Sequence, residues 1–261
     1  MATQLPDQPQ GPGPRLTLVE HLAELRRRLF ISLLAVGVTT ALSFTFTGKL
    51  FDFLKRPAPP ITFIYTQPTE LVSTYFKVAI ISGLVLALPV WLYQAVLFIA
   101  PGLSVTERRY VFLLLPAALL SFVAGAAFTY FILLPPTFKF LFEVFGQGIA
   151  VPQIRIGAYV SLVASLMFWV GLIFELPLVM YFLARIGILS PRLAGGLRRW
   201  ALVLAFVGAA IITPTTDPIT MTLVAAPMLV LFEVGLVLAR LGQRQHQRRA
   251  AQPQGESARA T

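Results

Sequence analysis

The chain has 261 residues, of which 57% are hydrophobic and 12% charged, and its mean hydropathy is +0.78. A water-soluble domain of this length cannot bury so much apolar surface, so the composition predicts a membrane protein. Cysteine is absent and the only histidines are His21 and His246, which excludes disulfides and thiol chemistry and leads us to expect no metal site and no cofactor.

Six apolar runs predict the fold class, because a helix needs about 20 mostly apolar residues to cross a bilayer. We expect an all-α polytopic membrane protein whose six transmembrane helices lie at about 29–48, 76–100, 110–134, 156–184, 200–212 and 218–239. The fifth run has 13 residues, or about 20 Å of helix, which is too short for a full bilayer. The bilayer is therefore expected to thin beside it. A single domain over 15–242 lies between tails at 1–14 and 243–261 that are expected to be disordered.

The positions of the basic residues predict the orientation, because short basic flanks stay in the cytoplasm. One set of flanks holds 15 of the 21 lysines and arginines, and the opposite set holds Lys49, Lys55, Arg56, Lys77, Lys139 and Arg155. Six spans with this asymmetry place both termini in the cytoplasm. The net charge of +10 is thus explained by topology, and because the arginines are scattered at helix ends no nucleic-acid partner is expected.

The segment from Thr17 to Arg26 predicts an amphipathic helix that enters the first span. Thr17 and Glu20 have the spacing of a capping box, and leucines recur at helical intervals. Glu24 lies one turn before Arg28, so the two side chains can form an ordinary ion pair. Alternatively, Glu24 is a surface carboxylate that receives a basic partner, since carboxylate and guanidinium match each other bidentately. The residues alone leave both possibilities open.

Glu175 interrupts the fourth apolar run. A carboxylate inside a membrane span costs about 3 kcal/mol or more, so such residues are functional by default. Pro177 removes a backbone donor nearby and frees carbonyl groups to which a protonated Glu175 can donate. A purely structural pairing with a hydroxyl group remains the alternative.

Two short polar links complete the pattern. Glu107 lies between the second and third runs beside Arg108 and Arg109, where it is either a solvated loop charge or a helix N-terminal charge. The link from Thr213 to Pro218 between the last two runs forms a tight turn, and Asp217 is expected to cap the sixth helix.

Four of these motifs, in order along the chain, resemble the TatC family. They are His21-Leu-Ala-Glu-Leu-Arg26, then Tyr93 to Leu103 followed by Glu107-Arg-Arg109, then Phe174-Glu-Leu-Pro177, and Thr213-Pro-Thr-Thr-Asp-Pro218. The resemblance implies a glove-shaped helical receptor with a concave groove and short fifth and sixth helices. It is implied to be no enzyme and to have no ATP site.

The resemblance also implies roles for particular residues. Signal-peptide binding is implied for Glu24, Leu25, Arg26 and Glu107, with the two carboxylates receiving the arginine pair. Glu175 is implied to face the groove, and the external segment with Pro57 and Phe76 to cap it. Partner helices are implied to contact the last external turn at Thr213, Pro214 and Asp217. Met221 stands where relatives often carry glutamine, so a polar contact there is weakened or supplied by Thr220.

The function implied is that of the core receptor of the twin-arginine translocation system in the bacterial cytoplasmic membrane. Its expected partners are twin-arginine signal peptides of folded precursors, the single-span proteins TatA and TatB, further copies of itself, and membrane lipid, with transport driven by the proton-motive force. Two rival readings remain. A transporter or proton channel would use Glu175 as a relay, and an assembly scaffold would not discriminate arginine pairs from lysine pairs.

Overall fold

The computed structural model of the chain describes residues 18–58, 62–99, 105–140, 153–190, 195–213 and 218–251. Within these ranges the chain is almost entirely helical, which confirms the predicted all-α class. The elements in chain order are α1 (Leu18–Lys55), β1 (Phe63–Ile64), α2 (Pro68–Ile99), α3 (Val105–Phe128), the π-helical turn η2 (Thr129–Leu133), α4 (Leu134–Lys139), β2 (Ile154–Arg155), α5 (Ile156–Ile173), α6 (Leu176–Arg185), α8 (Arg198–Ile212) and α9 (Pro218–Ala251).

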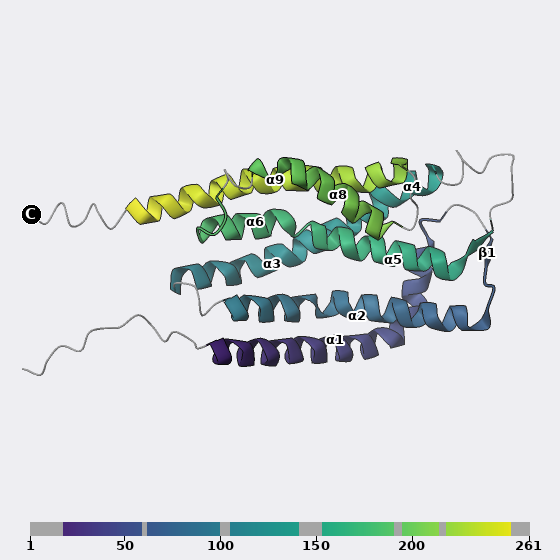
Figure 1. Ribbon diagram of the computed structural model, residues 1–261. Coiled ribbons are helices and arrows are strands. Elements are labelled where there is room, and N and C mark those ends of the chain that lie inside the picture. The colour runs from purple at the N-terminus through teal and green to yellow at the C-terminus, as the bar shows by residue number, and fades with distance from the viewer. Residues whose placement is uncertain are drawn as a thin grey trace, which may run out of the picture.

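The long helices run side by side along one direction (Figure 1). Helix α1 packs along α2, α3 packs against α5, and α9 packs along α6 and α8. Helices α1 and α3 begin, and α2, α6 and α9 end, on the left of the view, while β1 lies at the opposite end. The first turns of α1 and α3 and the last turn of α2 therefore share one end of the bundle, which we call the common end.

Five stretches are long and apolar enough to cross a membrane. They are Val19–Lys55, Pro68–Phe98, Phe112–Lys139, Ile156–Arg185 and Pro218–Gln245. Helix α8 has 15 residues, or about 22 Å, which agrees with the short helix predicted over 200–212. The total of six spans and their orientation remain predictions.

The expectation of a short sixth helix is wrong, because α9 runs over 34 residues. The segment after Arg240 is rich in glutamine, arginine and alanine, which favour helix, and the next proline after Pro227 is Pro253. Residues 243–251, which were expected to belong to a disordered tail, therefore continue the helix. The other expected tail, 1–14, lies outside the described residues.

Helices α1 and α2 approach closely through small residues. A Cβ atom placed on Gly83 of α2 would lie 2.2 Å from Oγ1 of Thr40 and 2.6 Å from its Cα, so only glycine fits there. Thr39 on α1 donates a hydrogen bond to the carbonyl of Gly83 at 2.8 Å. Close contact through small and hydroxyl-bearing residues is typical of helix pairs in membranes.

The outward surface of α1 is apolar. Leu33, Leu34 and Val38 are each more than half exposed. Such a continuous apolar face does not occur on a monomeric protein in water, whereas it is the expected surface of a helix that contacts lipid. The interior core lies instead around α5 and the η2–α4 segment, where five large side chains are almost completely buried: Leu133, Leu134, Val160, Val163 and Leu166.

Candidate binding site at the common end of the helices

A polar cluster joins the first turns of α1 to the last turns of α2. Nε of Arg28 donates a hydrogen bond to Oε1 of Glu24 at 3.0 Å, and Nη2 of Arg28 donates to the same oxygen. Nη1 of Arg28 donates to Oε1 of Gln94 on α2 at 3.3 Å. His21 stacks on Phe98 of α2 with ring centroids 4.5 Å apart. Of the two readings of Glu24, the structure therefore contains the ion pair with Arg28.

The cluster is reachable from solvent. The side chains of Glu24 and Arg28 each keep 21% of their surface exposed. Leu25 and Arg26, the other two predicted signal-peptide residues on α1, are exposed. The common end therefore presents a partly exposed carboxylate beside an exposed leucine and an exposed arginine. Such an arrangement can receive an extended basic peptide.

Glu107 is the second predicted carboxylate. It lies in the first turn of α3, and α3 begins at the common end with α1 (Figure 1). The side chain of Glu107 lies outside what the structure describes. The fold thus brings the helix turns that carry Glu24 and Glu107 to one end of the bundle.

Glu175 lies where α5 gives way to α6. Helix α5 ends at Ile173, and Pro177 stands in the first turn of α6. The carbonyl of Phe174 accepts a hydrogen bond from Oγ of Ser121 on α3 at 2.7 Å. Oε1 of Glu175 is buried and has no hydrogen-bond partner in the part of the chain that the structure describes. The expected break at Pro177 is present, and within it the carbonyl of Phe174 is bonded by Ser121 of α3.

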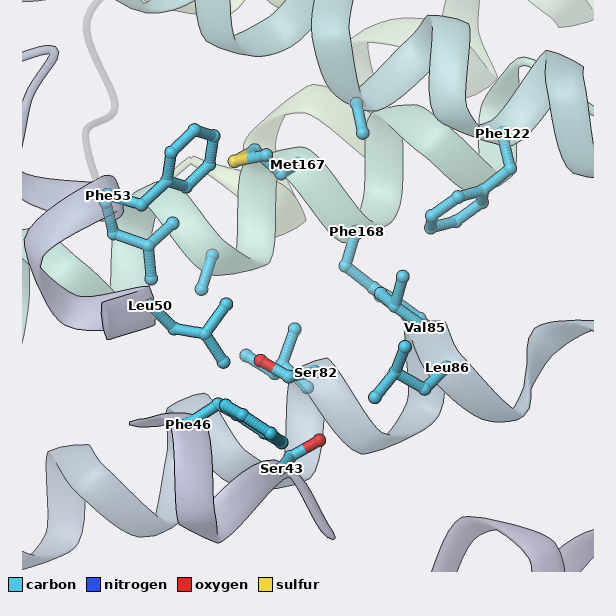
Figure 2. A pocket seen from close by; sticks show the side chains of 14 residues that line it. Ser43, Phe46, Leu50, Phe53, Ser82, Val85, Leu86, Phe122, Met167 and Phe168 are labelled. Atoms are coloured by element: carbon cyan, nitrogen blue, oxygen red, sulfur yellow. The ribbon is translucent and has the colours of Figure 1, made fainter. Parts of the chain in front are cut away.

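An apolar cavity of about 480 Å³ lies between α1, α2, α3 and α5 (Figure 2). Ser43 and Ser82 are its polar lining residues, and aromatic and aliphatic side chains such as Phe46, Phe122 and Phe168 form the rest. Oγ of Ser43 has no hydrogen-bond partner among the described residues. The cavity is therefore suited to apolar chains rather than to a polar solute.

Glu175 is 6% exposed and is not among the residues that line this cavity. That it faces a concave groove stays a prediction. Helix α3 packs closely on the α5–α6 junction, because a Cβ atom on Gly125 of α3 would lie 2.7 Å from the ring of Phe174. The glycine lets α3 approach and cover the junction.

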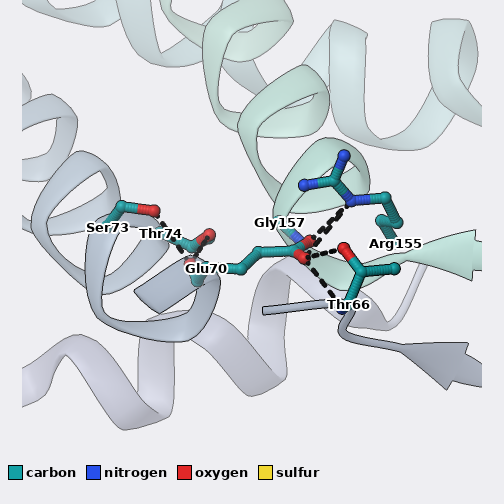
Figure 3. A network of polar contacts seen from close by, with 6 residues as sticks. All are labelled: Thr66, Glu70, Ser73, Thr74, Arg155 and Gly157. Carbon is teal, nitrogen blue, oxygen red and sulfur yellow. Dashed lines mark hydrogen bonds and ion pairs between the residues drawn. The ribbon is translucent and has the colours of Figure 1, made fainter. Parts of the chain in front are cut away.

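At the end opposite the common end, a carboxylate joins the segments that precede α2 and α5 (Figure 3). Glu70 in the first turn of α2 is 7% exposed. Its carboxylate accepts hydrogen bonds from the backbone N–H groups of Thr66 at 3.1 Å and Gly157 at 3.2 Å. It also accepts hydrogen bonds from the Oγ1 hydroxyl of Thr66 at 3.2 Å and from Nε of Arg155 at 3.2 Å. Beside this network β1 and β2 pair in parallel, with Phe63 opposite Ile154 and Ile64 opposite Arg155.

This Glu70 network fixes the segment that was predicted to cap the groove. Glu70 lies between the two predicted cap residues, Pro57 and Phe76, and its partners were not predicted. Pro57, a predicted cap residue, is partly buried. Phe76, the other one, is exposed and makes an edge contact with Phe44 at 4.8 Å between ring centroids. The segment is thus held by polar contacts at Glu70 rather than by Phe76.

The last external turn is described only at its first residue. Thr213 is buried and its Oγ1 donates to the carbonyl of Ala209 at 2.7 Å. Pro214 and Asp217 lie outside the described residues. On α9, Met221 is partly exposed, whereas Thr220 is 4% exposed and faces the interior. Of the two alternatives for the contact at Met221, a weakened contact or one supplied by Thr220, the burial of Thr220 favours the first.

The long apolar helices, the lipid-facing surface of α1 and the carboxylate at the common end together define a polytopic helical membrane protein with a polar cluster at one end of its helices. In the described part of the chain, no cluster of three or more metal-ligating side chains is present. The sequence pattern of the family "Sec-independent protein translocase protein (TatC)" matches residues 20–227. The chain belongs to the TatC family. It is a component of the twin-arginine protein translocase and is not an enzyme.

Individual relatives agree with this assignment. The Sec-independent protein translocase protein TatC of Carboxydothermus hydrogenoformans is 36% identical over 227 residues, which cover 86% of this chain and 93% of the relative. The TatC protein of Aquifex aeolicus is 38% identical over 234 residues, covering 88% and 97%. A crystal structure of the twin arginine translocase receptor TatC superimposes with a TM-score of 0.79 at 37% identity, covering 85% of this chain and 99% of that chain.

Proposed function

We propose that this chain is the receptor subunit that binds twin-arginine signal peptides of folded precursor proteins and organises TatA and TatB around them. Further copies of the chain join it in the receptor complex, and the proton-motive force drives transport. The description of the solved relative as a twin arginine translocase receptor supports this proposal. In this proposal Glu24 and Glu107 receive the two arginines, and Leu25 and Arg26 line the same surface.

One observation carries the proposal: the carboxylate of Glu24 already holds a guanidinium group, that of Arg28, at the common end. Two carboxylates facing one compartment can receive two guanidinium groups with paired hydrogen bonds. The ammonium group of lysine is a point charge and cannot reproduce that geometry. A receptor built in this way prefers arginine over lysine.

The proposed orientation puts the common end in the cytoplasm of a bacterium, with the protein in the cytoplasmic membrane. Basic residues support it, since Arg26, Arg27 and Arg28 lie in the first turns of α1, and Arg185 ends α6 at the same end. Short basic flanks remain in the cytoplasm. Both termini then face the compartment in which precursors are synthesised.

The partner surface is proposed at the opposite end, along the short helix α8 and the start of α9. Its residues are Thr213, Pro214, Asp217 and Met221. The exposed apolar side chains of Val207 and Ile211 on α8 and Ile219 on α9 support an apolar contact with a single-span helix. The membrane beside α8 is expected to be thin, because this helix spans only about 22 Å.

The test is export of a folded reporter with a twin-arginine signal peptide, in cells whose own TatC protein has been deleted. We expect Glu24→Gln to lower export by about tenfold or more, because hydrogen bonds to a charged group are worth about 1.5–3 kcal/mol. The matched control is Glu20→Gln, the same change one turn earlier on α1, with protein amounts checked by immunoblotting. Export by Glu24→Gln equal to that of the control would contradict the proposal.

A further inference from the structure

Arg28 is hydrogen-bonded to the carboxylate of Glu24, where a peptide arginine is proposed to bind. Two of its nitrogen atoms, Nε and Nη2, donate to Oε1 of Glu24. The third, Nη1, donates to Oε1 of Gln94, on the neighbouring helix α2. The guanidinium group is thus fixed on both sides in the protein without a peptide, and Glu24 is not an empty receptor site.

We propose that Arg28 is an internal competitor of the signal peptide: it holds Glu24 in the absence of a signal peptide, and an incoming peptide arginine must displace it. This inference rests on the proposed function, in which Glu24 receives the signal peptide. Because the contact between Arg28 and Glu24 is lost when a peptide binds, every basic group that binds to Glu24 is weakened by the same factor. Groups that bind the carboxylate weakly then fall below a useful affinity.

The geometry of the internal pair makes the exchange feasible. Arg28 lies four residues after Glu24 on the same helix, and both side chains are 21% exposed. Partly exposed pairs at this spacing are weak, so Arg28 can be displaced. Both hydrogen bonds that Arg28 donates to Glu24 go to the same carboxylate oxygen, Oε1. An incoming arginine is able to engage both carboxylate oxygens, which is the stronger arrangement.

Gln94 explains where Arg28 goes. Its side-chain oxygen accepts Nη1 of Arg28 at 3.3 Å, so the guanidinium keeps an acceptor on α2 when it leaves Glu24. A lysine of a peptide presents an ammonium group that is compact and strongly hydrated, and it gains no paired hydrogen bonds in exchange. Displacing Arg28 costs both groups the same free energy, and lysine has less binding free energy from which to meet that cost.

The experiment measures the affinity of fluorescent signal peptides for the full chain in lipid nanodiscs. Twin-arginine and twin-lysine peptides are titrated against wild type, Arg28→Met and Arg27→Met. Methionine keeps an unbranched apolar side chain and removes the charge. Arg27 is the adjacent exposed arginine, so Arg27→Met loses the same charge beside the site without freeing Glu24. The comparison between the two variants separates competition from general electrostatic attraction.

We expect Arg28→Met to bind the twin-arginine peptide about two- to fivefold more tightly than Arg27→Met, which is the range for releasing a weak ion pair. The twin-lysine peptide gains by the same factor wherever its binding is measurable, because the cost of displacing Arg28 does not depend on the group that displaces it, so the ratio of arginine to lysine affinity stays at the wild-type value. Arg28→Lys, which keeps the charge but not the guanidinium, falls between wild type and Arg28→Met.

Equal twin-arginine affinities in Arg28→Met and Arg27→Met would overturn the inference, as would weaker twin-arginine binding in Arg28→Met. Glu24→Gln is measured in the same series to separate this result from a failure of the proposed function. If Glu24→Gln binds the twin-arginine peptide as well as wild type does, the receptor site itself is wrong. If Glu24→Gln loses binding while Arg28→Met gains nothing, only the role of Arg28 is wrong.

Discussion

Replacement of Glu70 by glutamine lowers the melting temperature of the purified protein by about 5 °C or more. The carboxylate of Glu70 accepts the backbone N–H groups of Thr66 and Gly157 and the guanidinium of Arg155 on its two oxygens. Glutamine offers one oxygen and an NH₂ group, so donors on one side of the network lose their acceptor. A donor left without an acceptor in a buried site is more costly than the hydrogen bond is worth when formed.

The ion pair with Arg155 contributes the smaller part of this effect, because the side chain of Arg155 is 54% exposed and water screens the attraction. The control is Asp52→Asn, which removes a carboxylate whose partner Lys55 lies 2.9 Å away and which is itself 72% exposed. We expect the control to change the melting temperature by less than about 1 °C. Equal shifts in the two variants, measured by thermal unfolding in detergent, would show that the Glu70 network is not a structural tie.

The second large effect is expected at Glu175, where stability and transport should change in opposite directions. Replacement by leucine removes a carboxyl group that is 6% exposed and whose Oε1 has no hydrogen-bond partner among the described residues. The melting temperature should therefore rise by about 3 °C or more, because an unsatisfied buried polar atom is lost. Transport should fall below about a tenth of the wild-type rate, since a charge kept inside a membrane span at a cost in stability is kept for function.

Glutamine at the same position separates charge from size and polarity. Glu175→Gln keeps the shape of the side chain, so its transport should lie between those of wild type and Glu175→Leu. Thermal unfolding and export of a twin-arginine reporter are measured on the same preparations. Wild-type transport in Glu175→Leu, with raised stability, would mean that this carboxyl group has no role in transport.

The sequence predicted the features of the fold that depend on composition along the chain. Apolar runs located the membrane-length helices, and the 13-residue run at 200–212 predicted the short helix α8. Pro177 predicted the break between α5 and α6. The length of α9 was misjudged, because the end of apolar character after Ala239 was taken as the end of the helix. A helix can continue in water when its residues favour helix and no proline stops it.

The contacts that complete the candidate sites were not predictable from the pattern along the chain. Gln94 is 66 residues from Arg28, and Arg155 is 85 residues from Glu70. Such pairs depend on which helices become neighbours, and a single sequence does not contain that information in its periodicity. The pairing of Glu24 with Arg28 was foreseen as one of two possibilities, because both residues lie on one helix four positions apart.

The central claim is that the carboxylates at the common end receive the arginine pair of a signal peptide. Site-specific photocrosslinking of a precursor to membranes that contain this protein tests it most directly. A photoreactive residue is placed beside the arginine pair of the precursor, and wild type is compared with Glu24→Gln and Glu107→Gln. A twin-lysine precursor is added to wild type as the third altered case.

We predict a crosslink between the twin-arginine precursor and wild type that is lost in all three altered cases, while the amounts of membrane protein stay equal. Crosslinks that persist in all three would contradict the proposed site at Glu24 and Glu107. The absence of any crosslink with wild type would contradict the receptor function as a whole.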